Sequence, residues 1–333
     1  MKTYIKIGIT IGDPNGIGPE IILKTFSDLQ NINDSIIVIY SPFEIIDYYL
    51  KFLDIKIDYN ILKSAEEAKI GGVNLLPIDN GIFKVSMGVS NKASGAIAFQ
   101  SLSAASKDLI QNKIDCIVTA PIDKNTIQNK DFNFNGHTEY FTHLSKESNS
   151  LMLMVKDKLK VGIVTNHVPV NEVSKFLTTD QIFEKIELMH QALVRDFNVP
   201  NPKIALLGLN PHSGDNGLIG KEEIEIIIPT IKKALKNNFN VSGPFPADGF
   251  FASSSHKSFD GILGMYHDQG LIPFKILSQN EGVNFTAGLS FIRTSPDHGT
   301  AYDIVGKNKA NFSSFKTAVK TAKEIYVNRK NIK

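Results

Sequence analysis

Short β-rich apolar runs alternate with longer amphipathic stretches along almost the whole sequence, and this alternation limits the folds open to the chain. The runs read YIKIGITIG, SIIVIY, IDCIVTAP, KVGIVTN, KIALLGLN and DGILGMY. Near-continuous apolar runs of this kind suit strands of a parallel sheet that is covered on both faces. Because helix-length stretches separate them, the pattern predicts an α/β fold with crossover helices.

The stretches between these runs carry apolar residues at helical spacing. Ser94 precedes one of them and Thr179 or Asp180 precedes another, as residues that cap helix N-termini do. One late segment, GVNFTAGLSFIRTS, breaks the rhythm, and we expect a local antiparallel or irregular piece there. The helices are expected at 17–29, 41–53, 93–112, 178–197, 221–237 and 312–330.

The length of the chain indicates two domains, because 333 residues are more than one hydrophobic core comfortably serves. A polar stretch near 123–136 and the irregular region before the last helix are the candidate boundaries. We therefore expect a first α/β domain made of residues 1–128 and 294–333. The second α/β domain, residues 129–293, would carry most of the site residues.

Charge and composition exclude several classes of function. Lys and Arg number 36 against 34 Asp and Glu, whereas nucleic-acid-binding proteins carry a basic surplus on one face. No apolar stretch reaches the ~20 residues of a membrane helix, and the first residues lack a signal-peptide pattern. We therefore expect a cytoplasmic protein without nucleic-acid or membrane partners. Cys116 is the only cysteine, and its apolar neighbours predict a buried, inert thiol.

Three histidines follow strand-like runs with one local pattern. His167 follows VGIVTN, His212 follows IALLGLNP and His267 follows GILGMY, each beside a turn-forming Pro or Gly. Ligands of open α/β sheets bind at the carboxyl ends of strands, so three imidazoles in one crevice would form a divalent-metal site with open positions. The alternative is that each histidine is a hydrogen-bonded turn residue. Polar residues beside the histidines could orient the rings: Asn166, Asn210 and Asp268.

Other positions favour an anionic ligand. Lys275 follows GLIPF and Arg293 follows GLSFI, and a cation in an apolar run is costly unless it is paired or meets an anion. His137 and Thr138 stand at an apparent helix start, where free N–H groups and the helix dipole suit phosphate or carboxylate. The alternatives are snorkelling or an internal salt bridge for the cations, and a helix cap without a ligand. The loop GDPNGIGPE lacks the ending of a P-loop, and no dinucleotide fingerprint is present.

With these residues in view, the sequence resembles the 4-hydroxythreonine-4-phosphate dehydrogenase family of pyridoxal phosphate biosynthesis. The resemblance is carried, in order and without large gaps, by TIGDPNGIGPE, GHTEYF, NPHSGDNGLIGKEE, GPFPAD, YHDQGLIPFK and FIRTSPDHGTAYDIVG. It implies two α/β/α domains like those of isocitrate and isopropylmalate dehydrogenases, with the active-site cleft between them. It also implies a homodimer whose metal site is shared across the subunit interface.

The resemblance assigns roles to residues of this chain. It implies NAD or NADP as cofactor, with no residue assigned to it, and a divalent metal such as zinc, magnesium or cobalt. The metal ligands would be His167, His212 and His267. The substrate contacts would be His137, Thr138, Lys275, Asn284 and Arg293. The general base is not identified, and the candidates are Asp248, in GPFPAD, and Asp268, beside a metal ligand.

The reaction implied is the NAD-dependent oxidation and decarboxylation of 4-phosphohydroxy-L-threonine to 3-amino-2-oxopropyl phosphate, for pyridoxine 5′-phosphate biosynthesis. The motifs do not separate it from a dehydrogenase of a four-carbon sugar-acid phosphate, erythronate or threonate 4-phosphate, whose substrate lacks the amine. A metal-dependent hydrolase is a third alternative, because three histidines with an open position would also serve hydrolysis.

Overall fold

The structure is a computed structural model that describes residues 4–28, 34–78 and 83–331. The chain divides into two compact units, and each is described by itself. Unit 1 is Met1–Ser145 with Ser290–Tyr326, and unit 2 is Lys146–Leu289 with Val327–Lys333. Both units combine strands and helices along the chain, which confirms the predicted α/β class.

The units end at other residues than the domain boundaries expected after 128 and 293. Helix α4 (His137–Ser145) belongs to unit 1, because its aromatic side chains pack on that unit. Tyr140 stacks on Phe132 with ring centroids 5.3 Å apart, and Phe141 meets Phe291 at 5.8 Å. The second domain therefore holds fewer of the candidate site residues than expected.

The far end of the last helix, α10 (Ser313–Asn331), belongs to unit 2 although the helix begins in unit 1. Asn328 Nδ2 donates to the carbonyl of Asp196 (2.8 Å), and Arg329 Nε donates to its carboxylate (2.6 Å). Arg195 pairs with the same buried carboxylate at 3.0 Å. A buried carboxylate needs such partners, so this group anchors the last turn.

In unit 1 the strands form a parallel sheet. Their order is β3 (Tyr59–Ile61), β4 (Val73–Leu76), β2 (Ser35–Tyr40), β1 (Ile5–Thr10), β5 (Cys116–Thr119) and β12 (Ile292–Pro296). Each described pair of neighbours runs parallel. Strands β1, β2 and β5 are buried along almost their whole length, as strands covered on both faces are. Cys116 opens β5 and is buried, as predicted.

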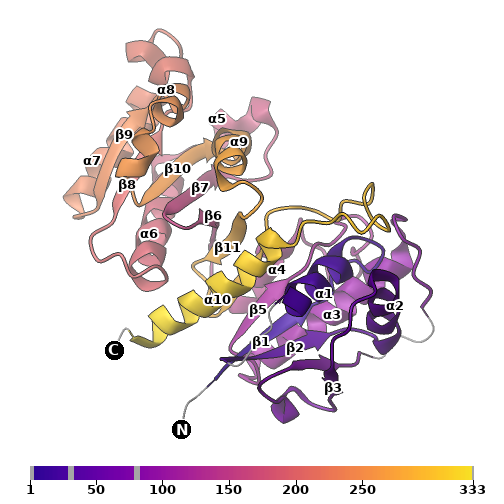
Figure 1. The fold of residues 1–333 in the computed structure, drawn as a ribbon. Helices are drawn as coiled ribbons and strands as arrows, with labels where there is room; N and C mark the ends of the chain where they lie inside the picture. The colour runs from indigo at the N-terminus through magenta and orange to yellow at the C-terminus, as the bar shows by residue number, and fades with distance from the viewer. Residues whose placement is uncertain (1–3, 29–33, 79–82, 332–333) are drawn as a thin grey trace. The chain divides into compact units, whose positions relative to one another are not determined.

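The helices α1 (Gly18–Asp28), α2 (Phe43–Leu53) and α3 (Lys92–Ile110) pack around this sheet together with α10 (Figure 1). The cap of α3 is Asn91, whose side chain accepts a hydrogen bond from the Ser94 N–H (2.9 Å). The prediction of Ser94 as the cap was wrong, because its hydroxyl is buried and donates to the carboxylate of Asp13 (3.0 Å).

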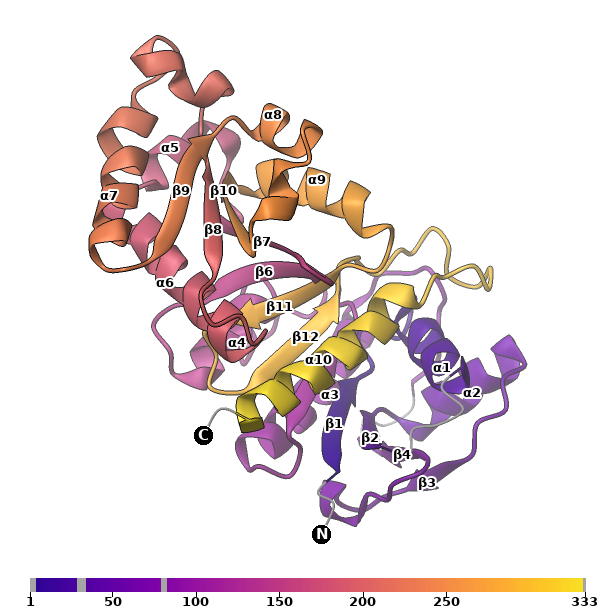
Figure 2. The ribbon, with the colours of Figure 1, turned by 60° about the vertical axis from the view of Figure 1, so that its left-hand side comes forward.

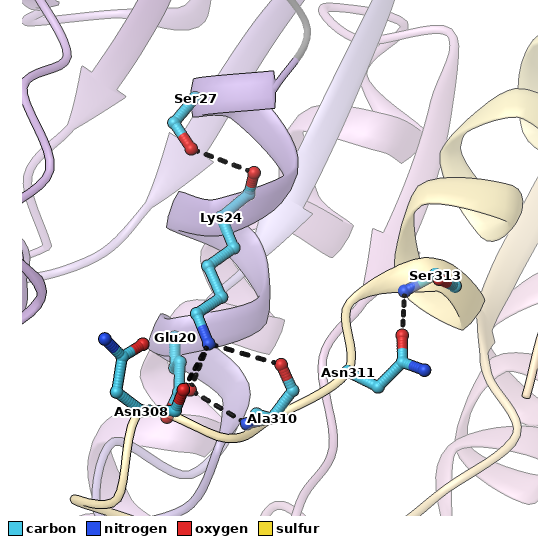
Figure 3. Close-up of polar contacts among 7 residues, drawn as sticks. All are labelled: Glu20, Lys24, Ser27, Asn308, Ala310, Asn311 and Ser313. Carbon is cyan, nitrogen blue, oxygen red and sulfur yellow. Dashed lines mark hydrogen bonds and ion pairs between the residues drawn. The ribbon is translucent and has the colours of Figure 1, made fainter.

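A buried carboxylate ties the segment before α10 to α1 (Figure 3). Glu20 Oε1 accepts hydrogen bonds from the Ala310 N–H (3.0 Å) and from Lys24 Nζ (2.7 Å). The same ammonium donates to the carbonyls of Asn308 (3.1 Å) and Ala310 (3.3 Å). Because a buried charge must be paired and hydrogen-bonded, the two side chains fix the path of residues 308–310.

In unit 2 the strand order is β11 (Val283–Ala287), β6 (Leu151–Lys156), β7 (Leu159–Thr165), β10 (Gly261–Tyr266), β8 (Lys203–Leu207) and β9 (Asn240–Phe245). β11 and β7 both run antiparallel to β6, whereas β7, β10, β8 and β9 run parallel. The antiparallel piece expected in GVNFTAGLSFIRTS is confirmed for β11. The second run of that segment is β12, which pairs parallel with β5 in unit 1.

Helices cover both sides of the sheet in unit 2. Figure 2 shows α6 (Thr179–Arg195) and α7 (Ile228–Lys236) on one side, and α8 (Ala247–Ala252) and α9 (His267–Ser278) on the other. The cap of α6 is Thr178, one residue earlier than predicted. In the described part of the chain, no helix is both long and apolar enough to cross a membrane. The remaining short helices are η1 (Ala65–Glu67), η2 (Val170–Glu172), α5 (Val173–Phe176), η3 (Pro211–Gly217), the π-helical η4 (Glu223–Ile227) and η5 (Ser255–Ser258).

Candidate functional site

The three histidines of the sequence pattern follow neighbouring strands of unit 2. His167 comes two residues after β7, His267 is the first residue of α9 directly after β10, and His212 lies in η3 beyond β8. These strands are adjacent and parallel, with Tyr266 opposite Thr165. Because the carboxyl ends of parallel strands meet at one edge of a sheet, all three histidines belong to the same edge.

Two of these histidines lie side by side. The rings of His167 and His267 have centroids 6.2 Å apart and planes tilted by 36°. Nδ1 of His267 is 2.7 Å from Oδ1 of Asp268, and the Thr165 hydroxyl donates to the carbonyl of Met265 (2.8 Å), which joins the two strand ends. Together with their neighbours the two rings line a pocket of about 380 Å³: Asn166, Val168, Pro169, Val170, Val173, Tyr266 and Asp268.

This pair fits a metal ion. A zinc ion would lie ~2.0–2.1 Å from each ligating nitrogen, and ring centres 6.2 Å apart are compatible with two imidazoles on one ion. Asp268 engages Nδ1 of His267, so Nε2 is the nitrogen left for a metal, in the carboxylate–histidine arrangement that orients metal ligands. Among the described residues, however, no group of three or more His, Cys, Asp or Glu side chains could hold an ion. His212 is therefore not brought to the pair within one chain.

The turn that carries His212 has an uncommon backbone. Residues 212–216 all have left-handed dihedral angles, with φ of 53° at His212 and 78° at Gly214. For residues other than glycine this conformation costs roughly 1–2 kcal/mol each. The turn therefore persists only where its surroundings hold it. Asn210, which could have oriented the ring of His212, instead donates through Nδ2 to Glu222 (2.7 Å) and Glu223 (2.8 Å).

The remaining candidates in unit 2 are spread over its helices and one strand. Asp248 on α8 and Asp268 on α9 line one pocket of about 320 Å³, together with Gln269. Gln269 joins two strand ends, since its Oε1 accepts from the Met265 N–H (2.7 Å) and its amide donates to Gly208 (2.5 Å). Lys275 is exposed on α9, which agrees with the snorkelling alternative considered for it.

Unit 1 holds three other candidates, His137, Thr138 and Arg293. We call this group the cationic corner, after the charge of Arg293. Helix α4 begins at His137, and Arg293 lies on β12 opposite Ile117 of β5. The guanidinium of Arg293 donates from Nη2 (2.9 Å) and Nε (3.2 Å) to the hydroxyl of Thr119 at the end of β5. This cation is 2% exposed, so of the two cations that follow apolar runs only Arg293 is buried.

Burial shifts both titratable groups of the cationic corner. Burial lowers the pKa of Arg293 to about 9, and the nearby carboxylate of Glu139 partly opposes this. The pKa of His137 lies well below its usual value because of burial first, and then the charges of Arg293 and Lys124. His137 is therefore neutral at neutral pH, and its buried Nε2 has no hydrogen-bond partner among the described residues.

A stability measurement tests this view of His137. When the pH falls below 6.5 the unfolded imidazole takes up a proton that the folded one refuses, so the free energy of unfolding should fall. The slope due to this group is at most about 1.4 kcal/mol per pH unit. We expect His137→Asn to lose less stability than the wild type between pH 7.5 and 5.5 in denaturant titrations. His143→Asn, an exposed position of the same helix, serves as the control, and equal pH slopes in all three proteins would contradict the assignment.

Sequence reasoning missed three residues that shape the candidate site. Thr119 holds Arg293, Lys124 acts on the charge of His137, and Glu223 holds the turn before His212. Thr119 could have been found as the polar residue that ends the apolar run CIVT. Glu223 lies in the same motif as His212, NPHSGDNGLIGKEE, although the motif does not say that its carboxylate holds the turn. For Lys124 the sequence gives no signal.

Comparison with known proteins links the chain to one family. Residues 33–322 match the family model described as pyridoxal phosphate biosynthetic protein PdxA. The 4-hydroxythreonine-4-phosphate dehydrogenase of Bacteroides thetaiotaomicron is 44% identical over 333 residues, which cover 100% of this chain and 92% of that protein. The crystal structure of the Klebsiella pneumoniae 4-hydroxythreonine-4-phosphate dehydrogenase matches with a TM-score of 0.83 at 31% identity, covering 98% of this chain and 99% of that one.

One relative carries a different name. A protein of Oceanobacillus iheyensis, provisionally named as a D-threonate 4-phosphate dehydrogenase, is 36% identical over 323 residues. The match covers 96% of this chain and 97% of that protein. Proteins this similar to the chain are therefore named for two different substrates. One substrate carries an amine and the other does not.

Proposed function

Because the chain belongs to the PdxA family of pyridoxal phosphate biosynthetic proteins, we propose that it oxidises and decarboxylates 4-phosphohydroxy-L-threonine. The product would be 3-amino-2-oxopropyl phosphate, a precursor in pyridoxine 5′-phosphate biosynthesis, and NAD or NADP would accept the hydride. The observation that carries the proposal is the pair of strand-end histidines, His167 and His267, with Asp268 on the second ring.

The proposed oxidation and decarboxylation require positive charge around the hydroxy-acid substrate. Removal of hydride from the hydroxyl-bearing carbon leaves a ketone β to the carboxylate, and such a β-keto acid loses carbon dioxide readily. His167, His212 and His267 would hold a divalent ion such as zinc, magnesium or cobalt. A divalent ion supplies Lewis acidity, which lowers the pKa of the substrate hydroxyl and stabilises the negative charge left by decarboxylation.

The substrate's phosphate and carboxylate need partners of the opposite charge. In the cationic corner, Arg293 offers a buried guanidinium, and α4 offers free N–H groups at His137 and Thr138. Nε2 of His137 and Oδ1 of Asn284 are buried without a hydrogen-bond partner among the described residues, which suits groups that await a ligand. Lys275 would add a second cation from its exposed position on α9.

A second copy of the chain would complete the metal site. One chain brings together His167 and His267 but no third ligand among its described residues. Helix α9 also exposes Ile272 at 57% and Ile276 at 72%, and exposed apolar side chains of this size suit a protein interface. These observations support the homodimer with a shared metal site that the family resemblance implies.

The general base would be one of two carboxylates, Asp248 or Asp268, which line the same pocket beside Gln269. Asp268 already engages His267, so it would act mainly by orienting that ring. Asp248 is exposed in the pocket, and it is the freer of the two to accept the proton of the substrate hydroxyl.

A substrate comparison tests the proposed function. Purified protein with a divalent metal should form NADH and release carbon dioxide with 4-phosphohydroxythreonine, and a chelator should stop both. The second candidate, a dehydrogenase of erythronate or threonate 4-phosphate, is favoured by the Oceanobacillus relative. If the protein prefers those substrates, the proposed dehydrogenase mechanism stands but the protein serves a different pathway. Release of phosphate without NADH would contradict both dehydrogenases and favour a hydrolase.

A further inference from the structure

A buried carboxylate lies against the chain on both sides of the turn that carries His212, and we propose that this residue, Glu223, positions His212 for the metal site. The inference rests on the proposed function, in which His212 is a metal ligand. Glu223 is the first residue of the π-helical turn η4 and is 2% exposed. Turns of the π type are rare and often mark functional sites.

Before His212, the carboxylate of Glu223 holds the chain through three hydrogen bonds. Oε1 accepts from the backbone N–H groups of Leu209 (2.7 Å) and Asn210 (2.8 Å). Oε2 accepts from the side-chain amide of Asn210 (2.8 Å). Because these donors are partly buried, loss of their acceptor would leave them unpaired, which is more costly than the bond itself.

After His212, the same carboxylate lies against the backbone of Gly214. A Cβ at this position would stand 2.6 Å from Oε2 of Glu223, and φ there is +78°. A Cβ at Gly208, before the turn, would stand 3.1 Å from Oε1 and 2.7 Å from the hydroxyl of Ser213. The chain is therefore held close to the carboxylate on both sides of His212.

This arrangement explains why the left-handed turn persists. The turn also has backbone hydrogen bonds of its own, among them Ser213 N–H to Asn210 (3.1 Å) and Ile219 N–H to Gly214 (3.0 Å), and Glu223 adds the bonds that hold the chain before it. Without Glu223, residues 212–216 would relax toward the right-handed region that is cheaper for all but glycine. The backbone at His212 would then change, and the imidazole would no longer be held in its present position. Glu223 is thus a positioning residue that acts on the metal through His212.

The experiment compares the Co²⁺ affinity and the visible Co²⁺ spectrum of the full-length protein in its native assembly, at a temperature where circular dichroism shows an intact fold. Glu223→Gln keeps the size of the side chain. In one orientation its amide NH₂ would face the backbone N–H groups of Leu209 and Asn210, and in the other it would face Asn210 Nδ2, so a donor meets a donor either way. For Glu223→Gln we expect about 10-fold weaker Co²⁺ binding and an altered spectrum. For Glu223→Ala we expect up to about 100-fold weaker binding. These values span the range for residues that hold metal ligands in place. The control is Glu225→Gln, an exposed carboxylate of the same π turn, which should bind Co²⁺ as the wild type does.

The outcomes separate this inference from the proposed function. If His212→Ala weakens Co²⁺ binding but the folded Glu223→Gln protein binds it normally with an unchanged spectrum, Glu223 is only structural and the inference is overturned. If His212→Ala itself binds Co²⁺ normally, the metal role of His212 falls, and the proposed metal site with it. A lowered thermal midpoint with normal Co²⁺ binding would also count against positioning.

Discussion

Replacing His212 with alanine is expected to reduce turnover at least about 100-fold while the fold stays intact. Loss of a partner of a metal ligand already costs ~10–100-fold in affinity or activity, and loss of a ligand itself should cost no less. The fold should tolerate the change because His212 is exposed in η3, and the bond that Glu223 accepts from the Asn210 N–H does not involve the imidazole. The measurement is kcat/KM with 4-phosphohydroxythreonine, with circular dichroism and Co²⁺ affinity on the same preparation.

A matched control separates loss of the ligand from loss of any imidazole. His190 lies on α6 of the same unit, where its ring contacts Phe239 at a centroid distance of 4.9 Å. His190→Ala should change stability more than activity, because it removes a packing contact away from the strand ends. Turnover at the wild-type level in His212→Ala would contradict the three-histidine metal site and leave the family assignment standing.

Replacing Arg293 with methionine is expected to weaken substrate binding by about 100-fold or more without lowering thermal stability in the absence of ligand. Truncating one partner of a buried, hydrogen-bonded charge pair typically costs 2–5 kcal/mol of binding. In the ligand-free protein, burial lowers the pKa of Arg293 to about 9, so the cationic form is disfavoured inside the fold. A methionine of similar length removes that cost, and the loss of the hydrogen bonds to Thr119 opposes the gain.

The prediction can be tested clearly because substrate binding should weaken while thermal stability should not fall. Thermal midpoints would be compared without ligand, and substrate dissociation constants would be measured by calorimetry. The control is Arg329→Met, which removes a 2.6 Å ion pair to the buried carboxylate of Asp196 and should therefore lower the midpoint while substrate binding is unchanged. A large loss of stability in Arg293→Met with normal substrate affinity would show that Arg293 is a structural ion-pair residue.

Helix α9 shows where local sequence was misleading. The segment HDQGLIPFK contains Gly270 and Pro273 and follows a strand, which favoured a turn after His267, yet the structure continues as a helix to Ser278. The glycine allows close packing, since a Cβ there would lie 2.9 Å from Ile163 Cγ2. Phe274 on this helix is buried, whereas Ile276 is exposed. One helix thus carries a buried and an exposed apolar face, and periodicity alone does not say which face meets the core.

The alternation of apolar runs and helical stretches by itself determined the α/β class, most of the helix positions and the place of three histidines after strand ends. These are local properties, because strand and helix patterns repeat over a few residues. Tertiary structure decided that Arg293 is buried and Lys275 exposed, that His167 and His267 meet, and that His212 sits in a left-handed turn. Such features depend on which distant segments pack together, and Glu223 reaches the turn only because a π-helical turn and a strand end are folded against each other.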